Sequence, residues 1–164
     1  MMSIDYRAKL VAWEDLALWR EAFRRTGRKL VVTNGCFDIL HLGHVTYLEQ
    51  ARSLGDALLV GVNGDQGVRE LKGPTRPVNA EGDRAGILAA LQAVDFACIF
   101  ADRRAVKFLR AAAPDVYVKG GDYTLETLDQ EERAAVESAG GRIVLIPFLP
   151  GRSTTALLEK IHRL

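Results

Sequence analysis

Five short apolar segments alternate with segments of helical periodicity along the chain, and this alternation constrains the fold more than any other feature. The apolar segments are Lys29 to Thr33, Ala57 to Val62, Phe96 to Phe100, Val116 to Lys119 and Arg142 to Phe148. Strands that alternate with helices are joined by right-handed crossovers and form a parallel sheet with helices on both faces. The sequence therefore predicts an α/β fold, a Rossmann-like doubly wound sheet of five parallel strands.

Helical periodicity fills most of the intervals between these strands. Helices are expected at residues 13–23 with Gly27 as the C-cap, from His41 to near Gly55, at 84–93, 105–112 and 131–139, and at 154–164 with Ser153 as the N-cap. Residues 63–79 are polar and glycine-rich, which predicts a long active-site loop with one helical turn at 68–71. The length of 164 residues fits one domain, residues 29–164, with an N-terminal helical segment, residues 1–28, packed on it.

Charge and cysteine content exclude several classes of function. The formal net charge is +1, so no global field attracts nucleic acid, and the short basic runs such as Arg103-Arg104 are expected to be solvated. Two cysteines, Cys36 and Cys98, indicate free thiols in a reducing compartment. No apolar run approaches the ~20 residues needed to span a bilayer, and Met1 to Lys9 lacks the apolar core of a signal peptide. We expect a cytoplasmic protein without a membrane partner.

The turn after the first strand carries two histidines, His41 and His44. A helix that begins there places both imidazoles on one face, with their Cβ atoms about 5–6 Å apart. The free N–H groups and the positive dipole end of the helix lie at the same place, where they favour an anion such as phosphate. Gly43 has no Cβ in the way of an approaching phosphate. The pair therefore predicts phosphate binding, with imidazoles that stabilise the charge on a leaving pyrophosphate.

The histidine pair and its neighbours could have roles other than phosphate binding. The histidines could merely cap the helix. Asp38, His41 and His44 could bind zinc, but the first and last of these diverge by ~120° on a regular helix. Cys36 is expected to be a neighbour of the site and not a nucleophile. The polar segments after the strands should converge at the carboxyl edge of the sheet, where ligands of such folds bind.

Several segments resemble a known family of enzymes. Gly35 to His44 resembles the signature of the nucleotidyltransferase superfamily with the His-x-Gly-His motif. Leu71 to Asn79, Ala90 to Asp95, Pro114 to Tyr123 and Ser153-Thr154-Thr155 resemble the D-glycero-D-manno-heptose 1-phosphate adenylyltransferases. In many bacteria this activity is the second half of a chain that is fused to a sugar kinase, and the resemblance covers roughly residues 29–161.

The resemblance implies an activity and its partners. Members transfer AMP from ATP, with Mg²⁺, to the sugar phosphate, giving ADP-heptose for lipopolysaccharide core synthesis and releasing pyrophosphate. The phosphate oxygen of the acceptor attacks the α-phosphorus in line, so the protein mainly positions the reactants and neutralises charge. A homodimer is implied, together with a separate heptose kinase and a phosphatase in the same pathway.

The resemblance also assigns roles to residues of this chain. Lys72 joins His41 and His44 as a catalytic residue, because an ammonium in the predicted loop can reach the phosphates. Asp38, Asp65 and Arg76 are expected to bind the sugar substrate. Asp38 would contact sugar hydroxyls or orient the motif loop, and Asp65 would contact the sugar phosphate region or help to hold Mg²⁺. Turn or capping roles are also open for both aspartates. The residues expected to bind the nucleotide are Asn34, Gly35, Phe37, Gly43, Arg84, Lys119, Gly121, Asp122, Ser153, Thr154 and Thr155.

Two positions depart from the family pattern, and two other functions stay open. Arg152 stands where many members have a small residue, and Leu158 stands where some have a basic one. A cytidylyltransferase for glycerol 3-phosphate or a similar alcohol phosphate shares the first motif, and a non-catalytic nucleotide sensor would have a similar site. A dinucleotide-dependent oxidoreductase is disfavoured, since no Gly-x-Gly-x-x-Gly follows the first strand.

Overall fold

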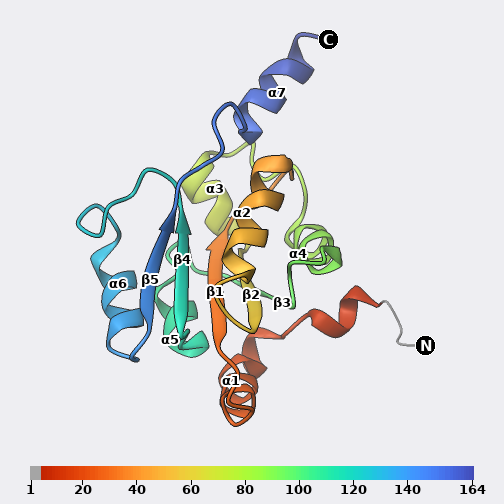
Figure 1. Cartoon of the computed structure of the whole chain (residues 1–164). Coiled ribbons are helices and arrows are strands. Elements are labelled where there is room, and N and C mark those ends of the chain that lie inside the picture. The colour runs from red at the N-terminus through yellow and green to blue at the C-terminus, as the bar shows by residue number, and fades with distance from the viewer. Residues whose placement is uncertain (1–4) are drawn as a thin grey trace.

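The computed structural model describes residues 5–164, and residues 1–4 of the predicted N-terminal segment lie outside the described residues. One sheet of five parallel strands, in the order β3-β2-β1-β4-β5, forms its centre (Figure 1). The α/β doubly wound prediction is confirmed. The strands are β1 (Leu30–Gly35), β2 (Ala57–Asn63), β3 (Phe96–Phe100), β4 (Val116–Gly120) and β5 (Arg142–Ile146).

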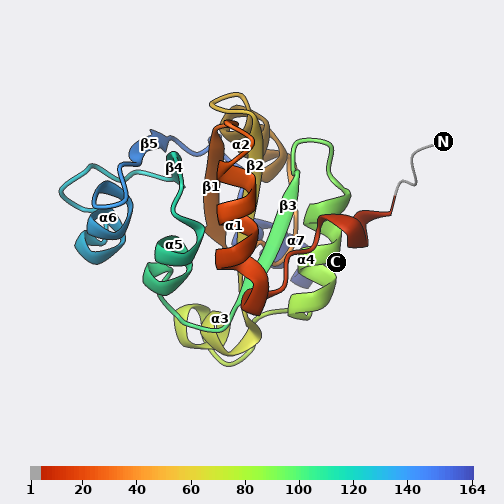
Figure 2. The same ribbon diagram turned by 90° about the horizontal axis from the view of Figure 1, so that it is seen from below.

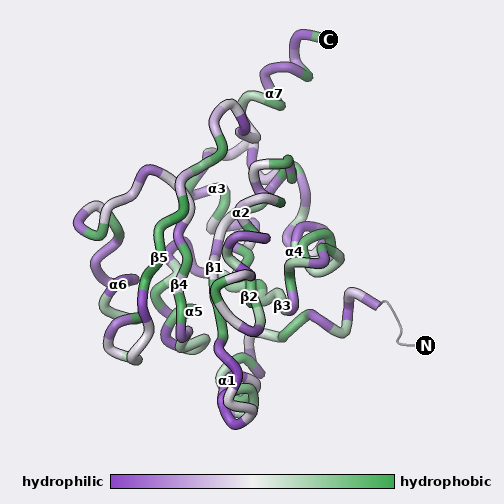
Figure 3. Tube along the Cα trace, viewed as in Figure 1, coloured by the Kyte–Doolittle hydropathy of each residue, from purple (hydrophilic) through white to green (hydrophobic). Residues whose placement is uncertain are grey.

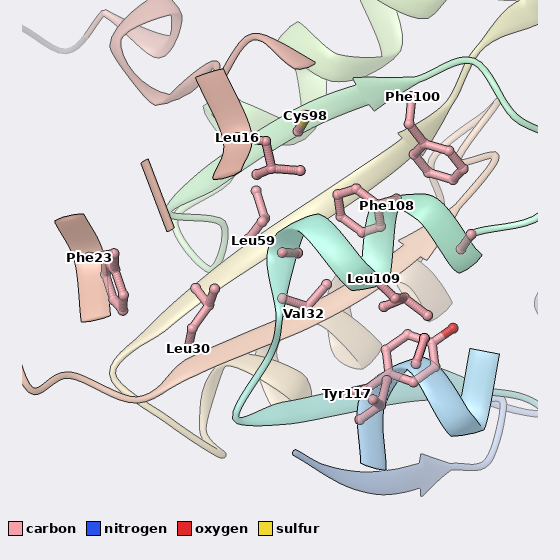
Figure 4. Packing of buried hydrophobic residues seen from close by; sticks show 14 of the residues in the cluster. Leu16, Phe23, Leu30, Val32, Leu59, Cys98, Phe100, Phe108, Leu109 and Tyr117 are labelled. Carbon is pink, nitrogen blue, oxygen red and sulfur yellow. The ribbon is translucent and has the colours of Figure 1, made fainter. Parts of the chain in front are cut away.

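Helices cover both faces of the sheet because each strand sends apolar side chains to both sides. One core cluster joins the sheet to α1 (Leu16–Arg24), α5 (Val106–Ala112) and α6 (Gln130–Glu137). Phe108 of α5 stacks on Phe100 of β3 at 4.9 Å, and Tyr117 of β4 closes the cluster near α6 (Figure 4). A second cluster joins the opposite face to α2 (Leu42–Arg52) and α4 (Glu81–Ala90). All seven residues of β2 are buried, as its apolar run predicts.

The N-terminal segment lies along the sheet. It contains the 3₁₀ turns Tyr6–Lys9 and Trp13–Asp15 and then α1, which crosses the sheet in the view from below (Figure 2). Leu16 and Phe23 enter the core, and Leu10 forms a bridge with Ala97 on the edge strand β3. The segment thereby pairs with part of an edge that would otherwise present free backbone groups.

The connections at the carboxyl edge differ from the sequence prediction in three places. The predicted loop at 63–79 contains a full helix, α3 (Asp65–Lys72), whose Val68 packs in the interior. Helix α2 begins at Leu42, so His41 is its extended N-cap residue. Helix α4 spans Glu81–Ala90, three residues earlier than predicted at both ends, since its acidic first turn favours the helix N-terminus.

The strand order reverses between β1 and β4, which is the switch point where folds of this type bind ligands. The last helix, α7 (Thr154–His162), lies beyond the arrowheads of the strands, above this point (Figure 1). The tube is mostly green along β5, and purple hydrophilic stretches gather in the surrounding helices and connections (Figure 3). None of the helices among residues 5–164 has the length and apolar character that crossing a bilayer requires.

Candidate active site

A cleft of about 710 Å³ opens at the carboxyl edge of the sheet, over the switch point between β1 and β4. Its walls come from segments far apart in the sequence: the β1–α2 turn, the end of α3, the β3–α5 loop, the end of β4, the start of α6 and the start of α7. Thirteen of the residues predicted for the site line it: Asn34, Gly35, Phe37, Asp38, His41, Gly43, His44, Lys72, Arg76, Lys119, Ser153, Thr154 and Thr155.

The two histidine rings form a stacked pair at the wall of this cleft. Their centroids lie 3.9 Å apart with an interplanar angle of 22°, and Phe37 packs edge-on against His44 at 5.4 Å. His41 stands outside the helix, so its extended backbone, and not a shared helix face, brings its ring over that of His44. The pair lies at the N-terminus of α2, where the N–H groups of Leu42 and Gly43 precede the first bonded turn of the helix, while His44 N–H donates to the His41 carbonyl at 2.9 Å.

Burial keeps both imidazoles neutral. It lowers the pKa of His44 to about 4, with a smaller contribution from His41, and it also lowers the pKa of His41, with a contribution from Arg152. In each ring Nδ1 is buried without a hydrogen-bond partner. A proton there would be an orphaned buried donor, which native structures avoid. We infer that both rings carry the proton on Nε2, the nitrogen left to donate to a ligand in the cleft.

The start of α7 packs against the histidine turn. A Cβ on Gly43 would lie 3.0 Å from the His41 ring and 3.1 Å from Cβ of Arg152, so a side chain at this position would crowd the ring stack. Thr154 donates its hydroxyl to the Ile39 carbonyl at 3.2 Å, and the Ser153 hydroxyl caps α7 by accepting from Ala156 N at 3.1 Å. Two of the three predicted hydroxyls therefore have structural partners, while the N-terminus of α7 faces the cleft.

Asp38 holds the loop before α4 in place. Its buried carboxylate accepts from Arg76 Nε at 2.6 Å and from the backbone N–H groups of Val78 and Asn79, each at 2.9 Å. Although burial alone would raise the pKa of Asp38, the donors Asn79, Val78 and Arg76 together keep it below its usual value. Because these partners occupy both oxygens, the geometry favours a loop-anchoring role over the predicted contact with sugar hydroxyls.

Arg84 and Asp65, which the sequence predicts to contact the substrates, do not line the cleft. The Arg84 side chain is fully buried. Its guanidinium donates to the carbonyls of Cys36 at 2.6 Å, Asn63 at 2.8 Å and Asn79 at 3.0 Å, and it pairs with Asp65 at 2.8 Å. These partners take four of its five N–H donors, and the remaining one belongs to a side chain that is fully buried away from the cleft lining. Arg84 instead ties together the chain segments behind the site.

The end of β4 contributes Lys119 and Gly120 to the cleft, but Gly121 and Asp122, which follow the strand, do not line it. Gly121 has φ +129°, a conformation that side chains rarely adopt, so the turn itself explains the glycine. Lys119 extends to α6, where its Nζ donates to Glu132 Oε2 at 3.1 Å.

Sequence reasoning missed several lining residues. Arg103 and Arg104 are exposed, as predicted, but they also line the cleft, which was not predicted. Their position directly after β3 was the available signal, because every strand ends at the same edge. Cys36 lies beside the site and burial raises the pKa of its thiol, which agrees with its predicted role as a neighbour. No sequence pattern pointed to the lining residues Tyr47, Asp129, Glu132, Phe148 and Leu149.

Comparison with known proteins fits this geometry. The sequence model described as Cytidylyltransferase-like matches residues 32–158, which include both histidines and all of the sheet except the first two residues of β1. The chain belongs to the cytidylyltransferase-like family. As a member of these nucleotidyltransferases it has the fold that the sequence resemblance predicts. The cleft with the paired histidines is therefore the candidate active site of the family member described here.

Individual relatives cover the chain almost completely. It is 46% identical over 159 residues to the Bifunctional protein HldE of Syntrophotalea carbinolica, a match that covers 97% of this chain and 32% of the relative. It is 50% identical over 145 residues to the Bifunctional protein HldE of Citrifermentans bemidjiense, covering 88% of this chain and 29% of the relative. The chain thus spans about a third of the length of these relatives.

A solved structure is also similar. The crystal structure of the lipopolysaccharide core biosynthesis protein from Thermoplasma volcanium GSS1 superposes with a TM-score of 0.62 at 29% sequence identity. The match covers 75% of this chain and 98% of the other.

The role assigned to Arg84 predicts a large stability effect. Arg84→Met leaves the carbonyls of Cys36, Asn63 and Asn79 without donors, and each unsatisfied buried acceptor costs about 1–3 kcal/mol. We expect urea unfolding to show a loss of at least about 3 kcal/mol in the free energy of unfolding. The control Arg69→Met removes an exposed arginine of α3, which contacts only Gln66. Equal stability of the two variants would contradict the bracing role.

The buried histidine pair predicts acid sensitivity. Because the pKa of His44 is depressed to about 4 from its ordinary value of 6.5, the unfolded chain binds more protons between these pH values. The wild type should therefore lose stability as the pH falls from 6.5 to 4. In His44→Gln this loss should be smaller, whereas His162→Gln removes an exposed imidazole as a control. Parallel pH dependences of unfolding in the wild type and His44→Gln would refute the prediction.

Proposed function

We propose that the chain is an adenylyltransferase that transfers AMP from ATP to D-glycero-D-manno-heptose 1-phosphate, releasing pyrophosphate and giving ADP-heptose for lipopolysaccharide core synthesis. The observation that carries the proposal is the stacked, neutral histidine pair at the N-terminus of α2, within the cleft at the switch point. The resemblance of several segments to heptose 1-phosphate adenylyltransferases and the likeness to Bifunctional protein HldE relatives support the choice of nucleotide and sugar.

The proposed chemistry is an in-line displacement at the α-phosphorus of ATP. A phosphate oxygen of the sugar phosphate forms the new bond to phosphorus as the bond to the pyrophosphate oxygen breaks. Negative charge grows on the leaving pyrophosphate, and two Nε2–H donors together with the first-turn N–H groups of α2 can stabilise it. Because both rings are neutral, they contribute oriented hydrogen bonds, and the cations of the cleft supply the opposing charge.

Two cations near the histidine turn are available for the phosphates, Lys72 and Arg152. Both line the cleft and are exposed, and neither has a carboxylate partner among the described residues. Lys72 ends α3, where it also faces the negative end of that helix dipole. The exposed ammonium of Lys72 suits the catalytic role predicted from the sequence. Arg152, which departs from the family pattern, adds a second positive charge beside His41.

Mg²⁺ is the cofactor proposed with ATP. Among residues 5–164, no group of three His, Cys, Asp or Glu side chains is placed to hold a metal ion. The carboxylates that line the cleft, Asp38, Asp129 and Glu132, already have cationic and N–H partners. Such a lining fits an ion that keeps water and phosphate oxygens as most of its ligands. Bound in this way, Mg²⁺ would neutralise charge on the triphosphate.

The wider setting is also a proposal. We place the protein in the cytoplasm as a homodimer, downstream of a separate heptose kinase and phosphatase that supply its sugar phosphate. The resemblance implies each of these partners. Phe148 and Ile161, which are 62% and 57% exposed, offer apolar surface near α7 for a second copy.

Pyrophosphate release tests the function directly. The purified chain should release pyrophosphate from ATP with heptose 1-phosphate, assayed with both anomers, and not with glycerol 3-phosphate. His41→Ala and His44→Ala should each lower kcat by about 10²–10³, by analogy with loss of one oxyanion donor. Turnover of CTP with glycerol 3-phosphate would instead assign the cytidylyltransferase alternative. ATP binding without pyrophosphate release would indicate a nucleotide sensor.

A further inference from the structure

A buried carboxylate, Glu132, stands in the first turn of α6 at the edge of the cleft. It is 5% exposed. Its Oε1 accepts from the backbone N–H of Ala105 at 3.1 Å, and its Oε2 accepts from Lys119 Nζ at 3.1 Å. Removing one partner from a buried ion pair of this kind leaves an uncompensated charge. Glu132 thus links three segments: α6, the end of β4 and the start of α5.

Lys119 is fixed by two contacts and keeps one donor free. Its Nζ donates to Glu132 and also to Tyr117 Oη at 3.2 Å. An ammonium has three N–H donors, so one is left, and the side chain lines the cleft with 19% of its surface exposed. Tyr117, which accepts from Lys119, donates to Asn34 Oδ1 at 2.7 Å. The network therefore runs from α6 across β4 to the end of β1.

The two ends of the cleft differ in charge. At the histidine end, Lys72 and Arg152 have no carboxylate partner among residues 5–164. At the opposite end, Arg104 pairs with Asp129 at 2.7 Å and with Glu131 at 3.1 Å, and Lys119 pairs with Glu132. Two of the three cations there, Arg104 and Lys119, are thus paired with carboxylates, and Arg103 forms no ion pair among residues 5–164.

The balance of charges at each end of the cleft determines which part of a substrate can bind there. Phosphates gain most from cations without a carboxylate partner, as at the histidine end. A cation that is already paired adds little net charge, but its remaining N–H is a strong and oriented donor. Such a donor matches the neutral hydroxyl groups of a sugar ring.

We propose that Glu132 is a positioning residue, which holds the Lys119 ammonium so that its free N–H binds a ring hydroxyl of one substrate. The ring is either the ribose of ATP or the heptose, which share this chemistry. The inference rests on the proposed function. It adds to that function a neutral sugar subsite at the end of the cleft away from the histidines, and a residue that does not itself touch the ligand.

Steady-state kinetics of Glu132→Gln tests the proposal, with KM measured separately for ATP and for heptose 1-phosphate. The amide can still accept from Ala105 but cannot pair with an ammonium. The KM of one substrate should rise about tenfold or more, with kcat changed less than about threefold, because a hydrogen bond from a charged group is lost. A raised KM for ATP assigns the ribose, and a raised KM for heptose 1-phosphate assigns the heptose.

Two further variants keep the test decisive. Lys119→Met should raise the same KM, and adding Glu132→Gln to it should cause no further loss, since the two residues act as one unit. Glu137→Gln removes an exposed carboxylate of the same helix and serves as the control. Unchanged KM values, a fall in kcat alone, a rise in both KM values, or additive losses in the double variant would overturn the proposal. An inactive wild type would overturn the proposed function as well.

Discussion

The site depends on one buried guanidinium. The Arg84 guanidinium donates to the carbonyl of Cys36 just after β1, to that of Asn63 at the end of β2 and to that of Asn79 before α4. Three separate connections are therefore fixed at a single point. Asp38, in the β1–α2 turn, accepts hydrogen bonds where Arg84 donates them. Its carboxylate binds the backbone N–H groups of residues 78 and 79 and the side chain of Arg76. Loops at the edge of a parallel sheet have few backbone partners of their own. These two buried charges supply such partners, and the histidine turn is thereby fixed relative to the sheet.

A fixed turn lets neutral groups act on a highly charged substrate. The histidines are desolvated against Phe37 and each other, and burial holds their pKa values below the ordinary range. They can therefore offer oriented donors without carrying charge. Lys72 and Arg152 supply the positive charge nearby, while the opposite end of the cleft balances its cations with carboxylates from α6. We therefore propose that the histidine end of the cleft binds the phosphates and that the opposite end binds a sugar ring.

Much of the fold follows from local sequence, because the apolar runs mark all five strands and the glycines mark their turns. The sequence also predicts that the segments near residues 34, 72, 119 and 153 come together in one cleft, because parallel strands all end at the same edge of the sheet. A loop-orienting role for Asp38 was one of two alternatives that the sequence left open. The task of Arg84 could not be foreseen, because a charged residue near a phosphate site resembles a ligand until its partners are known. Glu132 was missed for a related reason: its pairing with Lys119 joins residues 13 apart across two elements. Helix α3 was missed because glycines and charged residues mask its apolar face.

The central claim is that the stacked imidazoles bind the phosphates of the nucleotide through their Nε2 atoms. The most direct measurement is a crystal structure with a non-hydrolysable ATP analogue. The account predicts phosphate oxygens within hydrogen-bond distance of Nε2 of both His41 and His44. Phosphates bound at the Lys119 end, or out of reach of both rings, would contradict it.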